Sequence, residues 1–538
     1  MKNKRMLALI VLLAAAVAGG LWYKQKTETK EAETKTEEQE ELSKEIQEIY
    51  TESYQDEVEE RLEYAKQTGD YTEDAMLIEP NPYGTNTLSL YVYFETEEPA
   101  EVSYCVSVKD DDIPDFEAVP SGEDAYGTEH EFQVIGLIPD EKNTVTFTVT
   151  SQSGEEKTYD YTYNMGSLAG SEEVKLEQTA EQENGEKLSD GLYVVLGNDS
   201  DEQDFMYYYD NNGIIRGEIP LIGYRSHRLL FQNGLMYYSI SETKIAAVNQ
   251  LGKVEKIFDT GQYELHHDYV FDDDGNLLVL ATDTKSDSVE DQVIRVDTET
   301  GEVDCVLDLG DLFGEYKETC VENSDGELDW MHINAIQWMG DGTVLLSSRE
   351  TSSIIKVTDL YTTPKTAYII GEESFWEGTG YEGLLLEKDE SEGEFSGTGG
   401  QHSVTYVKDE SMPDGVYELY MFNNNMGVSE TNPDYDWTQI PGIETSVKEG
   451  ETSYYYRYRV DENNGTYTLV QSFKVPFSAY VSSVQEYGGN IVEDSGMQGL
   501  FGEYDEDGNL LVQFKMELAK SFIYRVYKYN FSDYYFAR

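Results

Sequence analysis

The chain has 538 residues, and its 107 acidic residues exceed its 38 basic residues, which gives a formal net charge of −69. A surface this acidic repels a phosphate backbone, so nucleic acid is not expected as a partner. Tyrosine and glycine are abundant and proline is scarce, with 43, 45 and 12 residues respectively. This composition favours a turn-rich β protein, in which any site for an anion must supply its own positive charge.

The first residues have the features of a targeting segment. Basic residues precede and follow an apolar run at 6–23. Such a pattern is typical of a secretory signal, with a cleavage site at 16–18, but the run is also long enough for a membrane anchor. We expect residues 1–26 to place the rest of the chain outside the cytoplasm, either secreted or anchored, with no other contact with the membrane.

Residues 27–70 are predicted to form a charged helical spacer. Apolar residues recur there at steps of three and four positions, namely Leu42, Ile46, Ile49, Tyr50, Tyr54, Val58, Leu62 and Ala65. This spacing puts them on one face of an amphipathic helix. The helix is expected to be a stalk or to pack on the following domain.

An alternating pattern of apolar and polar residues begins next and extends over 71–165. The segments NPYGTNTLSLYVYFET, AEVSYCVSV, HEFQVIGLIPD and NTVTFTVT are typical of strands separated by turns. They predict a small N-terminal β-sandwich. Residues 166–190 are polar and rich in glutamate, so they are predicted to be a linker.

From 191 to 538 an apolar run, a tight Asx-Gly turn and a second apolar run recur together. Examples are LLFQNGLMYYSI, YVFDDDGNLLVLATD, QWMGDGTVLLSSRE, VDENNGTYTLVQSF and EYDEDGNLLVQFK. No long helical period intervenes, and repeated up-and-down hairpins are typical of a β-propeller. The sequence therefore predicts an all-β fold, with a six-bladed propeller after the sandwich and the helical stalk.

Three cysteines occur, at positions 105, 305 and 320. Cys305 and Cys320 could pair in an oxidising compartment, which would leave Cys105 free, but their spacing alone leaves this open.

The stretch DWMHINAIQWMGDGTVLLSSRETSSIIKV, at 329–357, contains candidate polar site residues. The DG pair at Asp341 predicts a hairpin turn between two strands. In an extended strand His332 and Asn334 would share a face, and Arg349 ends the second strand. These three groups could hold an oxyanion; the alternative is a structural histidine with a solvated arginine.

The histidines point to the same region. Of six in the chain, four lie in three similar contexts before strands: His266 and His267, then His332, then His402. Equivalent positions of successive blades converge on the central channel of a propeller, so these motifs are expected to meet there. Zinc is the obvious rival ligand, because histidine binds it well. Asn334 and Arg349 favour an oxyanion over a cation, so we expect no metal.

Several segments resemble bacterial aryl-sulfate sulfotransferases of the PAPS-independent type. They are HHDYVFDDDGNLLVLA, DWMHINAIQWM, LSSRETSSIIKV, QHSVTYV and YMFNNN, with NPYGTN and VIGLIPD in the sandwich region. The resemblance covers roughly residues 78–538. It implies a six-bladed propeller after a sandwich, and sulfuryl transfer from a phenolic sulfate donor to a phenol acceptor through a sulfurylated histidine. No cofactor is implied, and no phosphate-cradling GxxxxGK[ST] loop is present.

The resemblance also implies roles for individual residues. His402 would be the nucleophile and His332 a general acid and base. The ligands of the sulfuryl oxygens and of the phenol would be Asn334, Arg349, His267 in preference to His266, and Tyr224.

The sequence departs from the family pattern in two places. Two tyrosines of a family loop are replaced here by Ile138 and Glu141, and the family's FDNG turn reads FNNN at 422–425. The first departure puts a contribution of the sandwich to the active site in doubt.

Two other classes of protein remain as alternatives. A sulfatase would hydrolyse the ester, but the C-x-[PA]-x-R pattern of formylglycine sulfatases is absent around the cysteines. A non-catalytic propeller that binds glycans or peptides would need no convergence of His332, Arg349 and His402. The sequence leaves the oligomeric state open, including a homo-oligomer.

Overall fold

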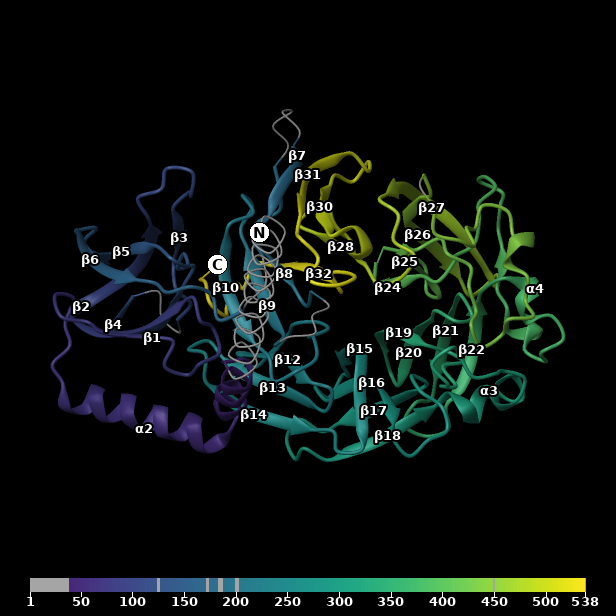
Figure 1. Cartoon of the computed structure of the whole chain (residues 1–538), viewed down its shortest axis with the longest axis horizontal. Helices are drawn as coiled ribbons and strands as arrows, with labels where there is room; N and C mark the ends of the chain where they lie inside the picture. The colour runs from purple at the N-terminus through teal and green to yellow at the C-terminus, as the bar shows by residue number, and fades with distance from the viewer. Residues whose placement is uncertain are drawn as a thin grey trace, which may run out of the picture.

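The computed structural model describes residues 38–122, 126–170, 174–181, 187–198, 203–409, 411–448 and 450–537. Figure 1 shows a β-sheet domain beside a ring of further sheets, which confirms the predicted all-β fold. The predicted signal or anchor at 1–26 lies outside the described residues. Within the described ranges, no helix has both the length and the apolar character needed to cross a membrane.

The N-terminal domain is built around one long strand, β2, that pairs with different partners along its length. Its first half pairs with β1 and β4, and its second half pairs with β3 and β5. Both halves contribute apolar side chains to one core. The strands are β1 (Leu77–Pro80), β2 (Ser89–Ser107), β3 (Phe116–Ala118), β4 (Gly127–Ile135), β5 (Lys142–Ser151) and β6 (Glu156–Asn164).

The alternating sequence explains the inward face of β5. Val145, Phe147 and Val149 are buried, while the threonines between them are partly exposed. Because side chains alternate across a strand, the segment NTVTFTVT buries one face only.

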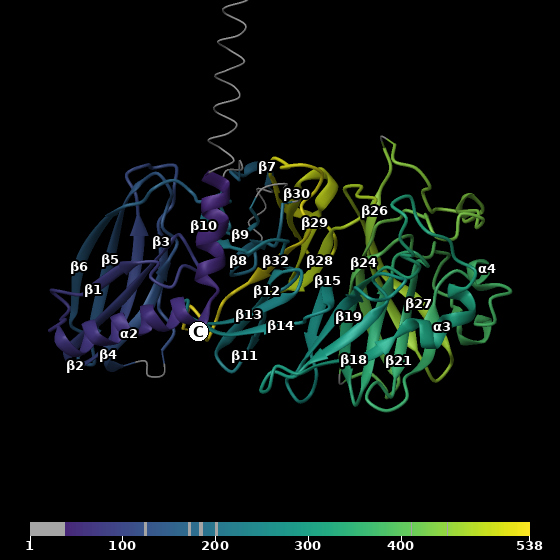
Figure 2. The same cartoon turned by 60° about the horizontal axis from the view of Figure 1, so that its bottom comes forward.

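The helical segment differs from the prediction, because it is broken at Tyr50. One helix covers 38–49, and α2 (Glu52–Thr68) follows in a new direction, as Figure 2 shows. Thr51 has an extended backbone, and its hydroxyl caps α2 by accepting a hydrogen bond from the Tyr54 amide. The Tyr50 hydroxyl donates to the Pro220 carbonyl of the propeller at 2.7 Å. The break therefore allows one helix to pack on the propeller and the next on the sandwich.

Gln55 of α2 connects these three parts and should contribute strongly to stability. Its amide donates to the carbonyls of Ile49 and Tyr83, and its side-chain oxygen accepts from the Val254 amide at 3.0 Å. Gln55→Ala leaves these groups without partners, so we expect unfolding to become easier by about 2–4 kcal/mol. Thermal unfolding measures this loss. Gln47→Ala, at an exposed position of the preceding helix, is the control, and equal melting temperatures for the two variants would contradict the prediction.

The ring is a β-propeller, as predicted, and the described residues form six sheets in it. In spatial order the first three sheets are β10-β9-β8-β32, β11-β12-β13-β14 and β15-β16-β17-β18. Their strands are β8 (Leu192–Val195), β9 (Phe205–Tyr209), β10 (Ile215–Pro220), β11 (Leu230–Gln232), β12 (Leu235–Ser241), β13 (Lys244–Asn249), β14 (Val254–Asp259), β15 (Tyr263–Phe271), β16 (Leu277–Asp283), β17 (Gln292–Val296), β18 (Val303–Asp308) and β32 (Val526–Tyr529).

The other three sheets are β19-β20-β21-β22, β23-β27-β26-β25-β24 and β28-β29-β30-β31-β7. Their strands are β7 (Glu177–Glu181), β19 (Ile333–Gly340), β20 (Thr343–Ser348), β21 (Ser353–Thr358), β22 (Lys365–Ile370), β23 (Glu387–Lys388), β24 (His402–Val407), β25 (Val416–Asn423), β26 (Ser453–Asp461), β27 (Thr466–Val475), β28 (Ser483–Tyr487), β29 (Asn490–Ser495), β30 (Leu500–Tyr504) and β31 (Leu510–Lys515). Short helices lie in the connections: α3 (Leu309–Lys317), α4 (Glu373–Trp376), η1 (Glu382–Leu384), η2 (Trp437–Gln439) and η3 (Gly496–Gln498).

Strands from both ends of the propeller region close the ring. β32, near the C-terminus, pairs with β8 of the first sheet, and β7 pairs with β31 of the last sheet. The interval 166–190 is therefore not only a linker, because it contains β7. The polar sequence of β7 has no apolar alternation that would have revealed a strand.

Two local predictions have clear outcomes. β19 and β20 form the predicted hairpin, with Asp341 and Gly342 both at positive φ in the turn. All three cysteines are described and free, so Cys305 and Cys320 do not pair. Cys305 lies on β18, whereas Cys320 follows α3.

Candidate active site

Strands β15, β19 and β24 lie around the middle of the ring in Figure 1, and each has a break in its register. Left-handed conformations occur at the break in β15, just before β19 and at the break in β24, where His267, His332 and Ser403 have φ of 54°, 48° and 56°. Such conformations are costly for residues other than glycine. The three histidine motifs thus each contain a left-handed residue in successive blades, but His266 and His267 lie inside β15 and not, as predicted, before a strand.

His402 is held in one tautomer. It is 2% exposed, and its Nδ1 lies 2.8 Å from Asn424 Oδ1 and 2.9 Å from the Gly400 carbonyl oxygen. Asn424 Oδ1 is the acceptor, because the amide nitrogen of Asn424 donates to the carbonyls of Ser478 and Val481. The proton therefore resides on Nδ1, and Nε2 keeps its lone pair.

The surroundings of His402 keep its ring neutral. Burial lowers the pKa of His402 to about 3, and the positive charges of His332, Arg349 and Arg525 act in the same direction. A hydrogen bond to Asn424 opposes this shift but does not overcome it. At neutral pH the ring is an uncharged base with a free nitrogen, which is the form that can act as a nucleophile.

His332 has the opposite protonation state to His402. Its Nδ1 lies 2.6 Å from Asp329 Oδ2 and 2.8 Å from Glu290 Oε2. Burial and Arg349 lower the pKa of His332, but the carboxylates of Asp329 and Glu290 outweigh them and raise it to about 9. At neutral pH this imidazole is protonated and can donate a proton.

The expected common face of His332 and Asn334 is not what the structure shows. β19 begins at Ile333, so His332 lies before the regular strand in a left-handed conformation. His332 contacts Glu290 and His267 of the preceding blade, and the ring centroids of the two histidines are 4.8 Å apart. Asn334 instead donates to the Gln401 carbonyl of the following blade at 2.9 Å. The two side chains thus connect three blades.

Arg349 lies close to both His332 and the turn before His402. Its amide donates to the His332 carbonyl, and its Nη2 lies 3.1 Å from Glu350 Oε1 and 3.8 Å from Asp329 Oδ2. A Cβ on Gly400 would lie 3.7 Å from Arg349 Cγ, so this arginine packs beside the turn that precedes His402. Its side chain is 26% exposed, so it is accessible to solvent.

His267 and His266 form a contiguous pair. Their Nδ1 atoms are 3.0 Å apart, so one ring donates to the other, and burial lowers both pKa values. Because His267 makes the ring contact with His332, it lies nearer to the protonated histidine than His266 does. The structure brings both into the cluster.

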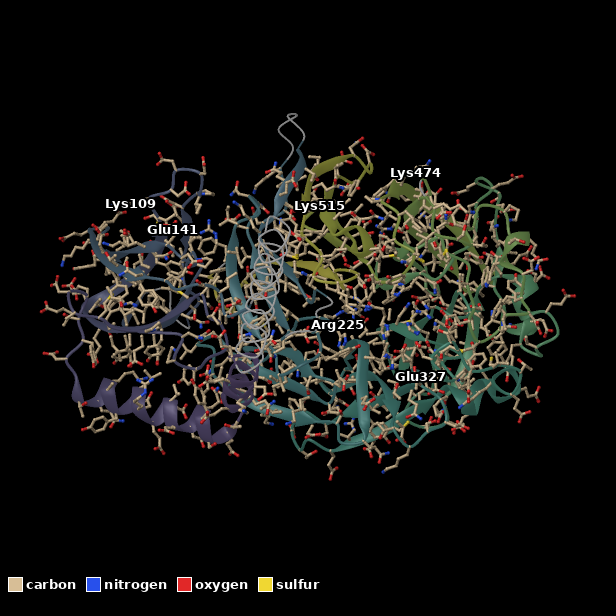
Figure 3. All side chains as sticks on the ribbon, viewed as in Figure 1. Lys109, Glu141, Arg225, Glu327, Lys474 and Lys515 are labelled. Atoms are coloured by element: carbon tan, nitrogen blue, oxygen red, sulfur yellow. The ribbon has the colours of Figure 1, made fainter. Side chains whose placement is uncertain are left out.

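Tyr224 lies at the edge of the same cluster. Its ring is 5.5 Å from that of His227, and the Arg225 guanidinium lies 4.6 Å above it. Arg225 also lies 4.2 Å from the ring of Tyr524, which in turn packs 6.1 Å from His267. In Figure 3 Arg225 is near the middle of the ring, whereas Glu141 is in the sandwich. The loop with Ile138 and Glu141 therefore lies away from this cluster.

Both domains of the chain match models of known protein families. Residues 177–525 match the family described as arylsulfotransferase (ASST), and residues 77–166 match the arylsulfotransferase Ig-like domain. The chain belongs to the arylsulfotransferase family. As an arylsulfotransferase it is a sulfotransferase enzyme, and small aryl sulfates and phenols fit as its substrates. The family match begins at the first residue of β7, in agreement with the place of that strand in the propeller.

The remaining comparisons are less informative for this arylsulfotransferase. No curated protein matches it. Among solved structures, a protein of unknown function from Bacteroides caccae has 11% identity and a TM-score of 0.35, and the match covers 63% of this chain and 98% of that one. The WD40 domain of Toxoplasma gondii coronin has 9% identity and a TM-score of 0.31, and the match covers 64% and 76% of the two chains.

Several residues of the candidate site were not predicted from the sequence. They are Glu290, Asp329, Asn424, Tyr524 and Arg525. Arg525, just before β32, donates to the Asn334 carbonyl at 2.8 Å and pairs with Asp268 at 3.3 Å. Asn424 lay in the FNNN turn and Asp329 began the stretch at 329–357, but neither was expected to have a role. Glu290 could not stand out in a chain with 107 acidic residues.

Nitrogen and oxygen atoms of two overlapping groups lie within 4.8 Å of one another, which is close enough to consider a metal ion. The groups are His266, His267 and Glu290, and Glu290, Asp329 and His332. A histidine that binds a metal ion must be neutral, with a free lone pair on the ligand nitrogen. Two carboxylates hold the proton on His332, and in the other group Nδ1 of one histidine donates a hydrogen bond to Nδ1 of the other. We therefore assign these residues to an ion-pair network.

Proposed function

We propose that this protein transfers a sulfuryl group from a phenolic sulfate ester to a phenol through a covalent intermediate on His402, without a nucleotide. The observation that carries the proposal is the pairing of a neutral His402, with its Nε2 lone pair available, and a protonated His332 in one buried cluster. One ring supplies the nucleophile and the other supplies the proton.

In the first half-reaction Nε2 of His402 attacks the sulfur of the donor. The bond between sulfur and the phenolic oxygen breaks, and His332 gives its proton to that oxygen. The phenol leaves, and His332 becomes neutral. The Nδ1 proton of His402 stays hydrogen-bonded to Asn424, so the imidazole ring of the sulfurylated histidine is positively charged. The ring can therefore leave the sulfur as a neutral imidazole, which is a good leaving group.

The second half-reaction reverses these steps with the acceptor. The neutral His332 takes the proton of the acceptor phenol, whose oxygen attacks the sulfur. The bond between sulfur and Nε2 breaks, which restores a neutral His402 and a protonated His332. Protons and electrons balance over the cycle, so no cofactor is required.

Three groups are suited to the oxygens of the transferring sulfuryl group. Arg349 offers a planar fork of N–H donors. Asn334 uses one amide hydrogen on the Gln401 carbonyl, and an amide has a second one for a ligand. His267, beside His332, is the third, and Tyr224 is the residue that we propose contacts the aromatic ring of the substrate. A loose transition state spreads charge over these oxygens, so positioned donors contribute most of the catalysis.

Two features count against the alternative of a non-catalytic binding module. Such a surface needs no strained backbone at three histidine motifs, and it needs no opposed protonation states in two buried histidines. Strain of this kind is concentrated at functional sites. We further propose that the enzyme works outside the cytoplasm, because of the apolar segment at 6–23.

Steady-state kinetics test the mechanism. Varying an aryl sulfate at several fixed concentrations of a phenol should give parallel double-reciprocal lines, since the donor product leaves before the acceptor binds. The rates should not depend on added nucleotide. Intersecting lines would exclude the covalent route, and release of inorganic sulfate without transfer to the phenol would identify a sulfatase instead.

A further inference from the structure

Glu290 belongs to the blade next to that of His332, and hydrogen bonds hold its backbone in place. It lies in the loop between β16 and β17 with a φ of 55°, a left-handed conformation. Its amide is bonded to the Thr282 hydroxyl at 2.9 Å, and its carbonyl accepts from the Ile333 amide at 3.1 Å. The next residue, Asp291, accepts a hydrogen bond from the Trp330 indole at 2.7 Å. This loop therefore clamps the segment that carries His332.

As a result, the carboxylates of Asp329 and Glu290 both lie close to Nδ1 of His332. Nδ1 carries a single proton, and the hydrogen bond goes to Asp329 at 2.6 Å. Glu290 Oε2 is 2.8 Å away and buried, but within the described ranges it accepts no hydrogen bond. Burial alone would raise the pKa of Glu290, but the three nearby histidines, His267, His332 and His266, hold it well below its usual value. Glu290 thus acts on His332 as a nearby negative charge.

The other groups that face His332 oppose its protonation or are neutral. Arg349 is positive, and His266, His267 and His402 have lowered pKa values because they are buried. Asp329 itself is shared, since it also lies 3.8 Å from the guanidinium of Arg349. Asp329 and Glu290 together therefore supply the attraction that keeps the proton on His332, with Asp329 as the larger contributor.

We propose that Glu290 and Asp329 are positioning residues that keep His332 protonated for the leaving group, and that this adapts the site to sulfate esters of unactivated phenols. The inference rests on the proposed function, since it gives His332 the role of the acid. An unactivated phenol such as the tyrosine side chain has a pKa of about 10. Its phenolate leaves poorly and needs a proton in the transition state, whereas an electron-poor nitrophenolate leaves without one.

The two kinds of donor provide the test. Glu290→Gln keeps the size of the side chain and removes its charge. It should lower kcat/KM for phenyl sulfate by roughly 30- to 100-fold, because general acid catalysis accelerates the departure of a poor leaving group by at least this factor. For 4-nitrophenyl sulfate, whose phenolate leaves without a proton, it should lower kcat/KM by less than about threefold. The basic limb of the pH profile with phenyl sulfate should move to lower pH, because His332 holds its proton less tightly once this negative charge is removed. Equal losses with both donors, or an unmoved limb, would overturn the proposal.

A matched control and a second variant make the result specific. Glu299→Gln changes an exposed glutamate of the same blade and should leave both rates unchanged. Asp329→Asn should show the same selectivity for the leaving group, and it decides the question if the first variant does not fold. A stoichiometric metal ion in the purified protein, with loss of activity in chelator, would also overturn the proposal.

Mass spectrometry separates this inference from the proposed function. The wild-type enzyme and Glu290→Gln should both become sulfurylated on His402 by 4-nitrophenyl sulfate in the absence of an acceptor. If the wild type is not sulfurylated, the proposed function fails. If it is, and the variant loses both donors equally, only the role of Glu290 fails.

Discussion

His402→Ala should abolish sulfuryl transfer, with a fall in kcat/KM on the order of 10⁴-fold or more, because no other nitrogen can take its place in the covalent step. Incubation with an aryl sulfate without acceptor should add one sulfuryl mass to the wild-type peptide that contains Gln401 and His402. The variant should show no such addition. Normal transfer by this variant would refute the covalent route.

His130→Ala is the matched control for this substitution. His130 is also buried, at 9% exposure, but it stacks on Phe94 in the sandwich, with ring centroids 4.8 Å apart. Its loss should affect the stability of that domain and leave the sulfurylation of His402 intact. The comparison separates the chemistry of one histidine from the general effect of removing a buried ring.

Arg349→Ala should lower kcat/KM for an anionic donor by roughly ten- to a hundredfold, because an ionic hydrogen bond to a sulfuryl oxygen contributes on the order of 1.5–3 kcal/mol. Lysine at this position should restore only part of the loss, since a point charge cannot contact two oxygens as a guanidinium does. The loss should persist at moderate salt, which screens the long-range field of the acidic surface but not a contact in the site.

Arg295→Ala provides the control for charge alone. Arg295 lies on β17 with a side chain 28% exposed, close to the 26% of Arg349, and it forms ion pairs with Asp272 and Asp297. Both substitutions remove one positive charge at similar exposure. Equal activities of the two variants would show that Arg349 acts only through the net charge of the protein.

The sequence predicted those features that have a local signal. The DG pair predicted the hairpin after His332, and the rarity of histidine made its three motifs visible. The structure added what depends on distant segments: Glu290 from a different blade, Asn424 behind His402, and Arg525 against Asn334.

Two errors have the same physical origin. The left-handed conformation of His332 and the break at Tyr50 are both fixed by tertiary contacts, such as the hydrogen bond from Tyr50 to Pro220. Periodicity assumes a regular element, so it cannot anticipate a backbone that packing has turned. The roles of His402, His332, Arg349, Asn334, His267, His266 and Tyr224 stay predictions until the variants are measured.

Closure of the ring by β7 and β32 has a consequence for the synthesis of the enzyme. A ribosome completes all three histidine motifs before it reaches Tyr524 and Arg525, whose side chains hydrogen-bond to the carbonyls of His267 and Asn334. β7, made much earlier, must wait for β31 to form its pairs. A nascent or truncated chain would therefore contain every reactive side chain and still lack an assembled centre. Sulfuryl chemistry should begin only when the last strand, β32, has joined the ring.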